Sequence, residues 1–190
     1  MNVIETKIPG LLVVEPRVFE DERGWFMEEH NAERFAEAGI EPGVTQINHS
    51  FSRQGVLRGL HFQAPPFDQT KLVRCVAGRL FDAVVDIRRG SPTYGQWFGL
   101  ELSAENKKAL FVPSGFAHGF CALTDCELLY LCGHAGYDKS SEGGLVYSDE
   151  QVGIDWPTDG TPLVNPRDLG FPTLSELESP FTFGKEERDA

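Results

Sequence analysis

The chain has 190 residues, a mass of 21.1 kDa, 41% hydrophobic residues and a formal net charge of −12 at pH 7. This length and composition predict one domain, residues 1–190, that can bury a core without disulfides or a structural metal. The pI near 4.8 argues against nucleic-acid binding, because that role needs a broad basic face. Any anionic ligand must therefore meet a local cationic pocket.

The N-terminal sequence MNVIETKIPG has neither the basic start nor the apolar run of a signal peptide. No apolar stretch approaches the roughly 20 residues that span a bilayer. The cysteines form no CxxC pair and have no zinc-like spacing with a histidine, so we expect buried free thiols at Cys75, Cys121, Cys126 and Cys132. These features predict a soluble, cytoplasmic protein with no membrane partner.

Short β-like runs separated by Gly, Pro, Asp and Ser fill most of the chain. No long segment has the 3.6-residue period of crossover helices, so the pattern predicts an all-β double sheet arranged as a sandwich or barrel. In chain order, the expected strands are LLVVEP (11–16), GWFMEEH (24–30), VTQINHSFS (44–52), GVLRGLHFQ (55–63), TKLVRCVAG (70–78), RLFDAVVDIRRG (79–90), GQWFGLELS (95–103), KALFVPSG (108–115), AHGFCALT (117–124) and CELLYLCG (126–133).

Two short helices are expected at the periphery. The first is NAERFAEAG, with Asn31 as the N-cap, Phe35 and Ala36 on the apolar side and Gly39 as the stop. The second would follow Thr173, where TLSE has the form of a capping box. It would belong to a C-terminal appendage of about residues 156–190, beside a core of about residues 10–155, and the last six residues, KEERDA, would form a loose tail.

The segment QINHSFSRQGVLRGLHFQAPPFDQTKLVRC places Arg58, His61 and Lys71 in what otherwise look like two buried strands. Burying cations and an imidazole is costly unless each is paired or used, so this segment indicates a site. Strict alternation puts Arg58 and His61 on opposite faces of their strand. Both can line one cavity only if Gly59 marks a bulge or kink, and a lone histidine at such a position is more often structural than catalytic.

Other polar residues in strands have a functional and a structural interpretation. A buried lysine is rare, so Lys71 favours a functional role, the alternative being a stem that extends to water. Arg74 falls on the opposite face, where the simplest expectation is an exposed side chain. Asp82 and Asp86 share a face that is either solvated or supplies a carboxylate to a site histidine or cation.

His118 lies among aromatic residues, and Tyr130 shares a face with Leu128 and Cys132. For both His118 and Tyr130 the simplest interpretation is a core residue with a satisfied hydrogen bond. The chain has no His-x-His pair, and its strand histidines lie beside cations that would repel a dication, so we predict no metal.

One imidazole, several cations and a phenol suit proton abstraction next to a carbonyl. The imidazole would take the proton, a cation would stabilise the enolate, and the phenol would return a proton from the other face and so invert the stereocentre. Arg23, Arg58 and Arg167 could bind a diphosphate through bidentate contacts.

At these residues the chain closely resembles the dTDP-4-dehydrorhamnose 3,5-epimerase family, nearly from end to end. The segments that carry the resemblance, in the family's order and spacing, are FEDERGWFMEEHN, QINHSFSRQGVLRGLHFQAPPFDQTKLVRC, FDAVVDIRRGSPTYGQW, VPSGFAHGF, LLYLC, GIDWP and NPRDLGFP. The resemblance implies a cupin-type jelly-roll barrel, usually a homodimer. It also implies the third enzyme of dTDP-L-rhamnose synthesis, acting on dTDP-4-dehydro-6-deoxy-D-glucose without a metal or organic cofactor.

Residue by residue, the resemblance implies that His61 is the catalytic base and that Asp168 in NPRD orients it. Asp168 does not emerge from the strand patterns. Tyr130 matches the proton donor on the opposite face, Lys71 and Arg58 match cations beside the 4-keto oxygen, and His118 matches a substrate-contacting histidine. Positions matching those that hold the nucleotide and its diphosphate are Arg23, Glu28, Gln46, Asn48, Glu142 and Arg167.

Some positions depart from the family pattern. Arg167 stands where the family often has lysine, YSDEQ replaces Trp-Asn-Asp-Pro, and GHAGY differs around Tyr137. These departures leave room for a mono-epimerase that inverts only C3 or only C5 of a related dTDP-4-keto-deoxysugar. A non-catalytic sugar-nucleotide-binding cupin and a metal-dependent cupin oxygenase are the alternatives from other classes.

Overall fold

The computed structural model describes residues 1–40 and 43–184. KEERDA, expected as a loose tail, lies outside the described residues. The strands are β1 (Asn2–Glu5), β2 (Leu12–Glu15), β3 (Val18–Asp21), β4 (Gly24–Met27), β5 (Val44–Ser52), β6 (Val56–Gln63), β7 (Gln69–Ala77), β8 (Arg79–Asp86), β9 (Trp97–Ser103), β10 (Ala109–Val112), β11 (Phe116–Ala122), β12 (Cys126–His134), β13 (Glu142–Gly144) and β14 (Leu163–Val164). The short helices are α1 (Ala32–Glu37), the 3-10 turn η1 (Lys139–Ser141) and α2 (Pro166–Leu169).

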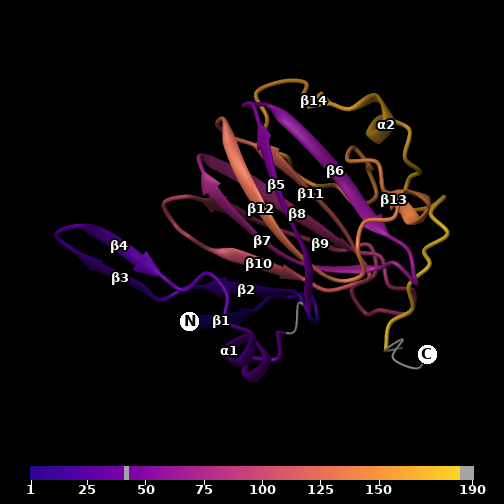
Figure 1. Ribbon diagram of the computed structural model, residues 1–190. Coiled ribbons are helices and arrows are strands. Elements are labelled where there is room, and N and C mark those ends of the chain that lie inside the picture. The colour runs from indigo at the N-terminus through magenta and orange to yellow at the C-terminus, as the bar shows by residue number, and fades with distance from the viewer. Residues whose placement is uncertain (41–42, 185–190) are drawn as a thin grey trace.

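Two sheets make up the barrel, and a hairpin projects from it (Figure 1). The first sheet has the order β1-β2-β10-β7-β12-β5, so β5 lies at its edge. The second has the order β13-β6-β11-β8-β9, with β14 pairing in parallel to β6, while β3 and β4 form the separate hairpin. The expected all-β jelly-roll fold is confirmed, and each of the ten predicted strand segments overlaps an observed strand.

Apolar side chains from both sheets meet between them. Val73 and Leu110 of the first sheet pack with Leu80, Val84 and Phe120 of the second. Because successive side chains of a strand point to opposite faces, residues two positions away from these core residues also face the barrel interior. All four cysteines are buried free thiols, as predicted.

The outer faces of the sheets are covered by α1 with the residues after it and by the C-terminal segment. Phe35 and Ile40, in and after α1, pack with Leu72, Phe111 and Leu131 on the outer face of the first sheet. The C-terminal segment covers the second sheet, since Leu145, Val152, Leu174 and Phe181 pack against Leu60, Phe62, Val85 and Ile87. Within the described ranges, no helix is long and apolar enough to cross a membrane.

The first predicted helix is confirmed and the second is wrong. Asn31 caps α1 by accepting from the Arg34 N–H at 3.1 Å, and Phe35 is buried, but Ala36 is exposed. At Thr173 the capping-box contact forms, with Glu176 accepting from the Thr173 N–H, yet only a turn follows. The C-terminal helix is α2, where Asn165 is the N-cap and Pro166 fills the first turn.

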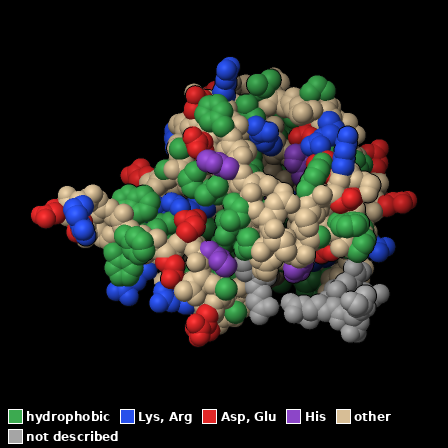
Figure 2. Space-filling view, viewed as in Figure 1, with side chains coloured by type: hydrophobic (Ala, Val, Ile, Leu, Met, Phe, Trp, Pro, Cys, Tyr) green, Lys and Arg blue, Asp and Glu red, His purple; other side chains and the backbone are tan. Residues whose placement is uncertain are grey.

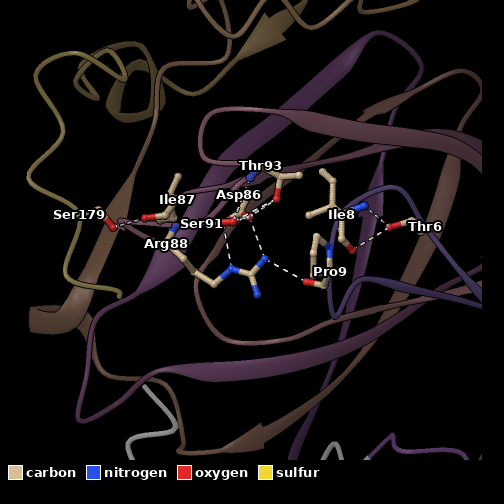
Figure 3. Close-up of polar contacts among 9 residues, drawn as sticks. All are labelled: Thr6, Ile8, Pro9, Asp86, Ile87, Arg88, Ser91, Thr93 and Ser179. Atoms are coloured by element: carbon tan, nitrogen blue, oxygen red, sulfur yellow. Dashed lines mark hydrogen bonds and ion pairs between the residues drawn. The ribbon is translucent and has the colours of Figure 1, made fainter. Parts of the chain in front are cut away.

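Asp86 is buried, so the solvated interpretation of this face is wrong (Figure 3). Its carboxylate accepts from Ser91 Oγ at 2.6 Å, from Thr93 Oγ1 at 2.7 Å and from the Arg88 guanidinium at 2.7 Å. Arg88 also donates to Pro9 O at 2.9 Å. This satisfied network therefore fastens the N-terminal loop to the end of β8, where burial without partners would be costly.

Arg74 is also buried, at 8% exposure, so the expectation of an exposed side chain is wrong. Its strand neighbour Ala109 belongs to the outer cluster beneath α1, and its guanidinium pairs with Glu29 in the segment between the hairpin and α1. Strand alternation correctly placed Arg74 outside the barrel. The helix that covers this face is what buries it.

Candidate active site

The bulge expected at Gly59 is present, and it brings Arg58 and His61 to the same face of β6. His61 lies opposite His118, and Arg58 lies opposite Phe120, with a shift of register between the two pairs. His118 and Phe120 are two residues apart in β11, so they share a face, and directly opposed residues of neighbouring strands do as well. Arg58 and His61 therefore both lie on the face of β6 that lines the barrel interior. Arg58 is nevertheless exposed, so the expectation of a buried cation is wrong at this position.

Two glycines make this bulge possible. Gly59 has φ +119, a backbone conformation that residues other than glycine rarely adopt. A Cβ atom there would lie 2.6 Å from Gly119 Cα, and one at Gly119 would lie 2.6 Å from Arg58 O. The absence of both side chains allows β6 and β11 to approach closely beside His61.

The short helix α2 places Asp168 against His61. Asp168 is 2% exposed, and its Oδ2 lies 3.0 Å from His61 Nε2 and accepts from the Gly59 N–H at 3.2 Å. Strand patterns missed this residue because it lies outside the sheets. The signal that could have located the helix is Asn165-Pro166, an N-cap followed by proline, although nothing in that signal names His61 as the neighbour.

Arg167 contacts the same imidazole nitrogen as Asp168 does. Its Nη2 lies 3.1 Å from His61 Nε2, its Nε donates to Asp168 Oδ1 at 3.1 Å, and its Nη1 donates to Glu142 Oε2 at 2.8 Å. Tyr137 also donates to Glu142 Oε2, at 3.1 Å. These contacts form a continuous polar cluster from α2 to β13 and the loop before it.

Burial is the main reason why the pKa of His61 lies below its ordinary value. The Asp168 carboxylate raises this pKa, while the charges of Lys71 and Arg167 lower it further. Burial alone would raise the pKa of Asp168, but His61, the Gly59 N–H and Arg167 together bring it below the usual value. The neutral imidazole and the ionised carboxylate are therefore both favoured near neutral pH.

Lys71 lies on the interior face of β7, two residues before the buried Val73, opposite Cys132 of β12. Burial lowers its pKa, and the charges of Asp82 and Glu142 partly oppose this effect, as Cys132 does. The Lys71 side chain is half-buried and lines the small hollow described below.

His118 and Asp82 form a second buried imidazole–carboxylate pair. His118 is 4% and Asp82 0% exposed, and His118 Nε2 lies 2.9 Å from each carboxylate oxygen. The simplest sequence-based interpretation of His118, a core histidine with a satisfied hydrogen bond, is confirmed in its geometry. Of the two interpretations of Asp82, the solvated one is wrong and the carboxylate that orients a histidine is confirmed.

Tyr130 lies on β12 of the first sheet, with its ring centroid 6.5 Å from that of His118. Its hydroxyl lies 3.3 Å from Ser50 Oγ. Burial raises the pKa of Tyr130 to about 12, and the Ser50 hydrogen bond and the nearby Arg58 charge only partly oppose this. The phenol thus keeps its proton throughout the neutral range.

Arg58, Gln46 and Asn48 lie around Tyr130. Arg58 donates to Ser52 Oγ and to Phe51 O, both at 3.0 Å. On β5, Asn48 lies opposite Tyr130 and accepts from Gln46 Nε2 at 2.8 Å. These side chains continue the polar wall from the phenol to the edge of the first sheet.

Arg23 and Glu28 are not brought to this site. Arg23 is 85% exposed at the turn of the β3–β4 hairpin, where it pairs with Asp21 at 2.6 Å, and Glu28 pairs with Arg34 of α1 at 2.9 Å. Figure 1 shows the hairpin extending away from the barrel, on the side opposite α2 and β13.

Two hollows lie near residues that the sequence predicted for the site. A small one, of about 10 Å³, is lined by Lys71, His118, Gln63 and Phe116 among others. A larger one, of about 520 Å³, lies between the base of the hairpin, α1 and the outer face of the first sheet and contains neither His61 nor Tyr130. The chemistry of the residues, not the size of the hollow, identifies the candidate site. Among the described residues, no group of three or more His, Cys, Asp and Glu side chains could hold a metal ion.

The family model for dTDP-4-dehydrorhamnose 3,5-epimerase matches residues 5–176. The chain belongs to this family. A dTDP-4-dehydrorhamnose 3,5-epimerase of Shigella flexneri is 52% identical over 171 residues, which cover 89% of this chain and 93% of that protein. The crystal structure of a dTDP-6-deoxy-D-glucose-3,5-epimerase from Legionella pneumophila, in complex with dTDP-4-keto-L-rhamnose, superposes with a TM-score of 0.89 at 44% identity, covering 93% of this chain and 94% of that one.

The family also includes a relative with a narrower name. A dTDP-4-dehydrorhamnose 3-epimerase of Streptomyces niveus is 43% identical over 170 residues, which cover 89% of this chain and 82% of that protein. The relatives of this chain therefore include both 3,5-epimerases and a 3-epimerase.

Proposed function

We propose that this protein is a cytoplasmic epimerase that converts dTDP-4-dehydro-6-deoxy-D-glucose to dTDP-4-dehydro-L-rhamnose by inverting C3 and C5. The observation that supports this most directly is the arrangement of His61 and Tyr130. The paired imidazole lies on the second sheet and the phenol lies on the first, so the two face the space between the sheets from opposite walls.

This arrangement suits inversion. Neutral His61 removes the proton at a carbon next to the 4-keto group, and the Asp168 carboxylate stabilises the imidazolium that forms. The enolate oxygen is stabilised by Lys71 and Arg58. Tyr130, still protonated, delivers a proton from the opposite wall, so the configuration at that carbon is reversed.

One pocket can serve both centres, because C3 and C5 both flank the 4-keto group and the same enolate stabilisation applies to each. The ketone itself makes the protons acidic, so the two transfers need no cofactor. After each inversion, His61 loses its proton to solvent and Tyr130 regains one, which resets the site.

The cations of this acidic protein also suit an anionic nucleotide. Lys71 lines the small hollow, Arg58 lies near Tyr130, and Arg167 contacts His61. Gln46, Asn48 and Glu142 supply the polar contacts that the family resemblance assigns to the nucleotide and diphosphate. Arginine is well suited to phosphate because its planar fork donates two hydrogen bonds at once.

We further propose a homodimer in which the hairpin of one protomer completes the site of the other. Arg23 and Glu28 match nucleotide-binding positions, but Arg23 lies at the turn of the β3–β4 hairpin and Glu28 just after it, and Figure 1 shows this hairpin extending away from β6, the strand that holds His61. The hairpin exposes Phe19, Trp25 and Phe26, which form a hydrophobic surface in Figure 2. Edge strand β5, next to Tyr130, exposes Ile47 and Phe51, so a second copy offers a matching apolar edge.

Solvent exchange tests the proposed reaction. Incubation of dTDP-4-dehydro-6-deoxy-D-glucose with the protein in D₂O should place deuterium at both C3 and C5, as read by NMR of the product. Label at C3 alone would instead identify a 3-epimerase like the Streptomyces niveus relative, and nucleotide binding without any label would identify a non-catalytic binding protein.

A further inference from the structure

The Nε2 atom of His61 has two neighbours, one that requires it to donate a hydrogen bond and one that requires it to accept one. Asp168 Oδ2 lies 3.0 Å away and can only accept a hydrogen bond, whereas Arg167 Nη2 lies 3.1 Å away and can only donate one. A neutral imidazole nitrogen either carries a proton or offers a lone pair, but not both. The two contacts therefore correspond to different tautomers of His61.

The tautomer decides whether His61 can act as a base. If Nε2 carries the proton and faces Asp168, the lone pair is on Nδ1, for which the described residues supply no hydrogen-bond partner. If Nε2 accepts from Arg167, the proton is on Nδ1 and the only lone pair is occupied by the guanidinium. The second tautomer cannot abstract a proton.

The guanidinium of Arg167 is placed so that it can leave. Its side chain is 49% exposed, and its other contacts are to the carboxylates of Asp168 and Glu142 and to the face of the Phe171 ring, whose centroid lies 5.8 Å from the guanidinium carbon. A diphosphate offers several anionic oxygens to the same donors, and such charge-assisted bidentate contacts are strong. The charged groups that act on His61 are then Asp168 and Arg167 from α2 and Lys71 from β7, with Glu142 of β13 bound to Arg167.

Asp168 can exchange one partner for the other. In the present arrangement it accepts from Arg167 Nε and from the Gly59 N–H. When the guanidinium moves away, the carboxylate loses one donor and the Nε2–H of His61 can replace it. The buried carboxylate thus keeps its hydrogen bonds in both states, as burial requires.

We propose that Arg167 is a positioning residue that couples diphosphate binding to the tautomer of His61. In the empty site Arg167 holds the inactive Nδ1–H tautomer. Binding of a diphosphate draws the guanidinium away, one proton leaves Nδ1 to water, one from water joins Nε2, and Nδ1 becomes the base. This inference rests on the proposed function, because the diphosphate belongs to the proposed substrate.

Nitrogen NMR of the full chain labelled with ¹⁵N-histidine tests the coupling, since ¹⁵N shifts distinguish a protonated from an unprotonated ring nitrogen. The His61 signals are assigned from their loss in His61→Asn, at about pH 8, where an unperturbed histidine is neutral. We expect Nδ1–H in the free protein and Nε2–H with saturating dTDP. In Arg167→Met we expect Nε2–H with and without dTDP, while Arg53→Met, at an exposed arginine outside the site, should match the wild type.

Nε2–H in the free wild-type protein, or identical spectra for wild type and Arg167→Met, would overturn the proposal. An Arg167-dependent tautomer that dTDP leaves unchanged, with dTDP shown to be bound by its own NMR signals, would overturn the coupling to the diphosphate. The outcome is independent of turnover, because the tautomers are read without substrate. Absence of deuterium exchange into substrate would refute the proposed reaction and leave these spectra as they are.

Discussion

His61 is surrounded by groups whose effects on its protonation oppose one another. Burial, Lys71 and Arg167 favour the neutral ring, and Asp168 favours the charged one. Taken alone, the Asp168 carboxylate raises the pKa of His61. The net effect has the opposite sign, because burial is the largest contribution.

Replacement of His61 should remove exchange at both carbons. We expect His61→Asn to lower deuterium incorporation at C3 and C5 by about a hundredfold or more, the usual contribution of a general base. The matched control is His134→Asn, because His134 is exposed and has φ +69, which asparagine tolerates. Near-normal exchange in His61→Asn, with dTDP binding retained, would refute the assignment of the base.

The pH dependence of the reaction follows from the same residue. Because the pKa of His61 is lowered, the neutral base persists below pH 6.5, and the acid limb of kcat/KM should have its midpoint below that value. Asp168→Asn should move the limb lower still, since the carboxylate raises this pKa. The alkaline limb should have its midpoint below pH 10.5, because the lowered pKa of Lys71 makes this residue lose its charge there. Tyr130 does not set this limb, since its pKa is about 12. An acid limb at or above 6.5 would contradict this account.

At the scale of elements, the irregular part of β6 is what builds the site. A regular strand would turn Arg58 away from His61, and the bulge at Gly59 restores both to one face. The close approach of Gly59 and Gly119 makes this part of the sheet intolerant of any side chain.

Gly59→Ala should therefore destabilise the protein more than strain alone explains. Backbone strain at positive φ costs about 1 to 3 kcal/mol, and the displaced backbone of β11 adds to this. Gly160→Ala is the matched control, because Gly160 has φ +96 but no atom within 4 Å of a Cβ, so only the strain remains. Urea denaturation measures both free energies of unfolding. Equal losses in the two variants would show that the approach of β6 and β11 is not tight.

At the scale of the whole molecule, the residues proposed to bind the nucleotide do not all lie at one site within a single protomer. The hairpin that holds Arg23 projects from the barrel, and the edge strand next to Tyr130 is unpaired on its outer side among the described residues. A symmetric pair of protomers would place one hairpin at each site.

Mixing two inactive variants tests this sharing of the site. If Arg23 serves the partner subunit, Arg23→Ala and His61→Asn protomers mixed after denaturation and refolding should recover activity, because each mixed dimer has one intact site. Random mixing gives about half mixed dimers and so about a quarter of wild-type activity. The separately refolded variants are the control. No recovery in a mixture shown to contain mixed dimers would mean that Arg23 acts within its own protomer.

The sequence by itself determined the all-β class, the ten main strands, the helix capped by Asn31 and the buried thiols, because period-two alternation, turns and caps are local signals. It also located the need for a bulge at Gly59, since two functional side chains conflicted with strict alternation. Family resemblance, rather than pattern, supplied Asp168.

Only the tertiary structure decided which neighbours each polar residue meets. Arg74 is buried because α1 packs over it, and the TLSE segment remains a turn despite its capping contact. His61 meets Asp168 and Arg167 across more than a hundred residues of chain. Such contacts depend on how whole elements pack, and no local propensity records that packing.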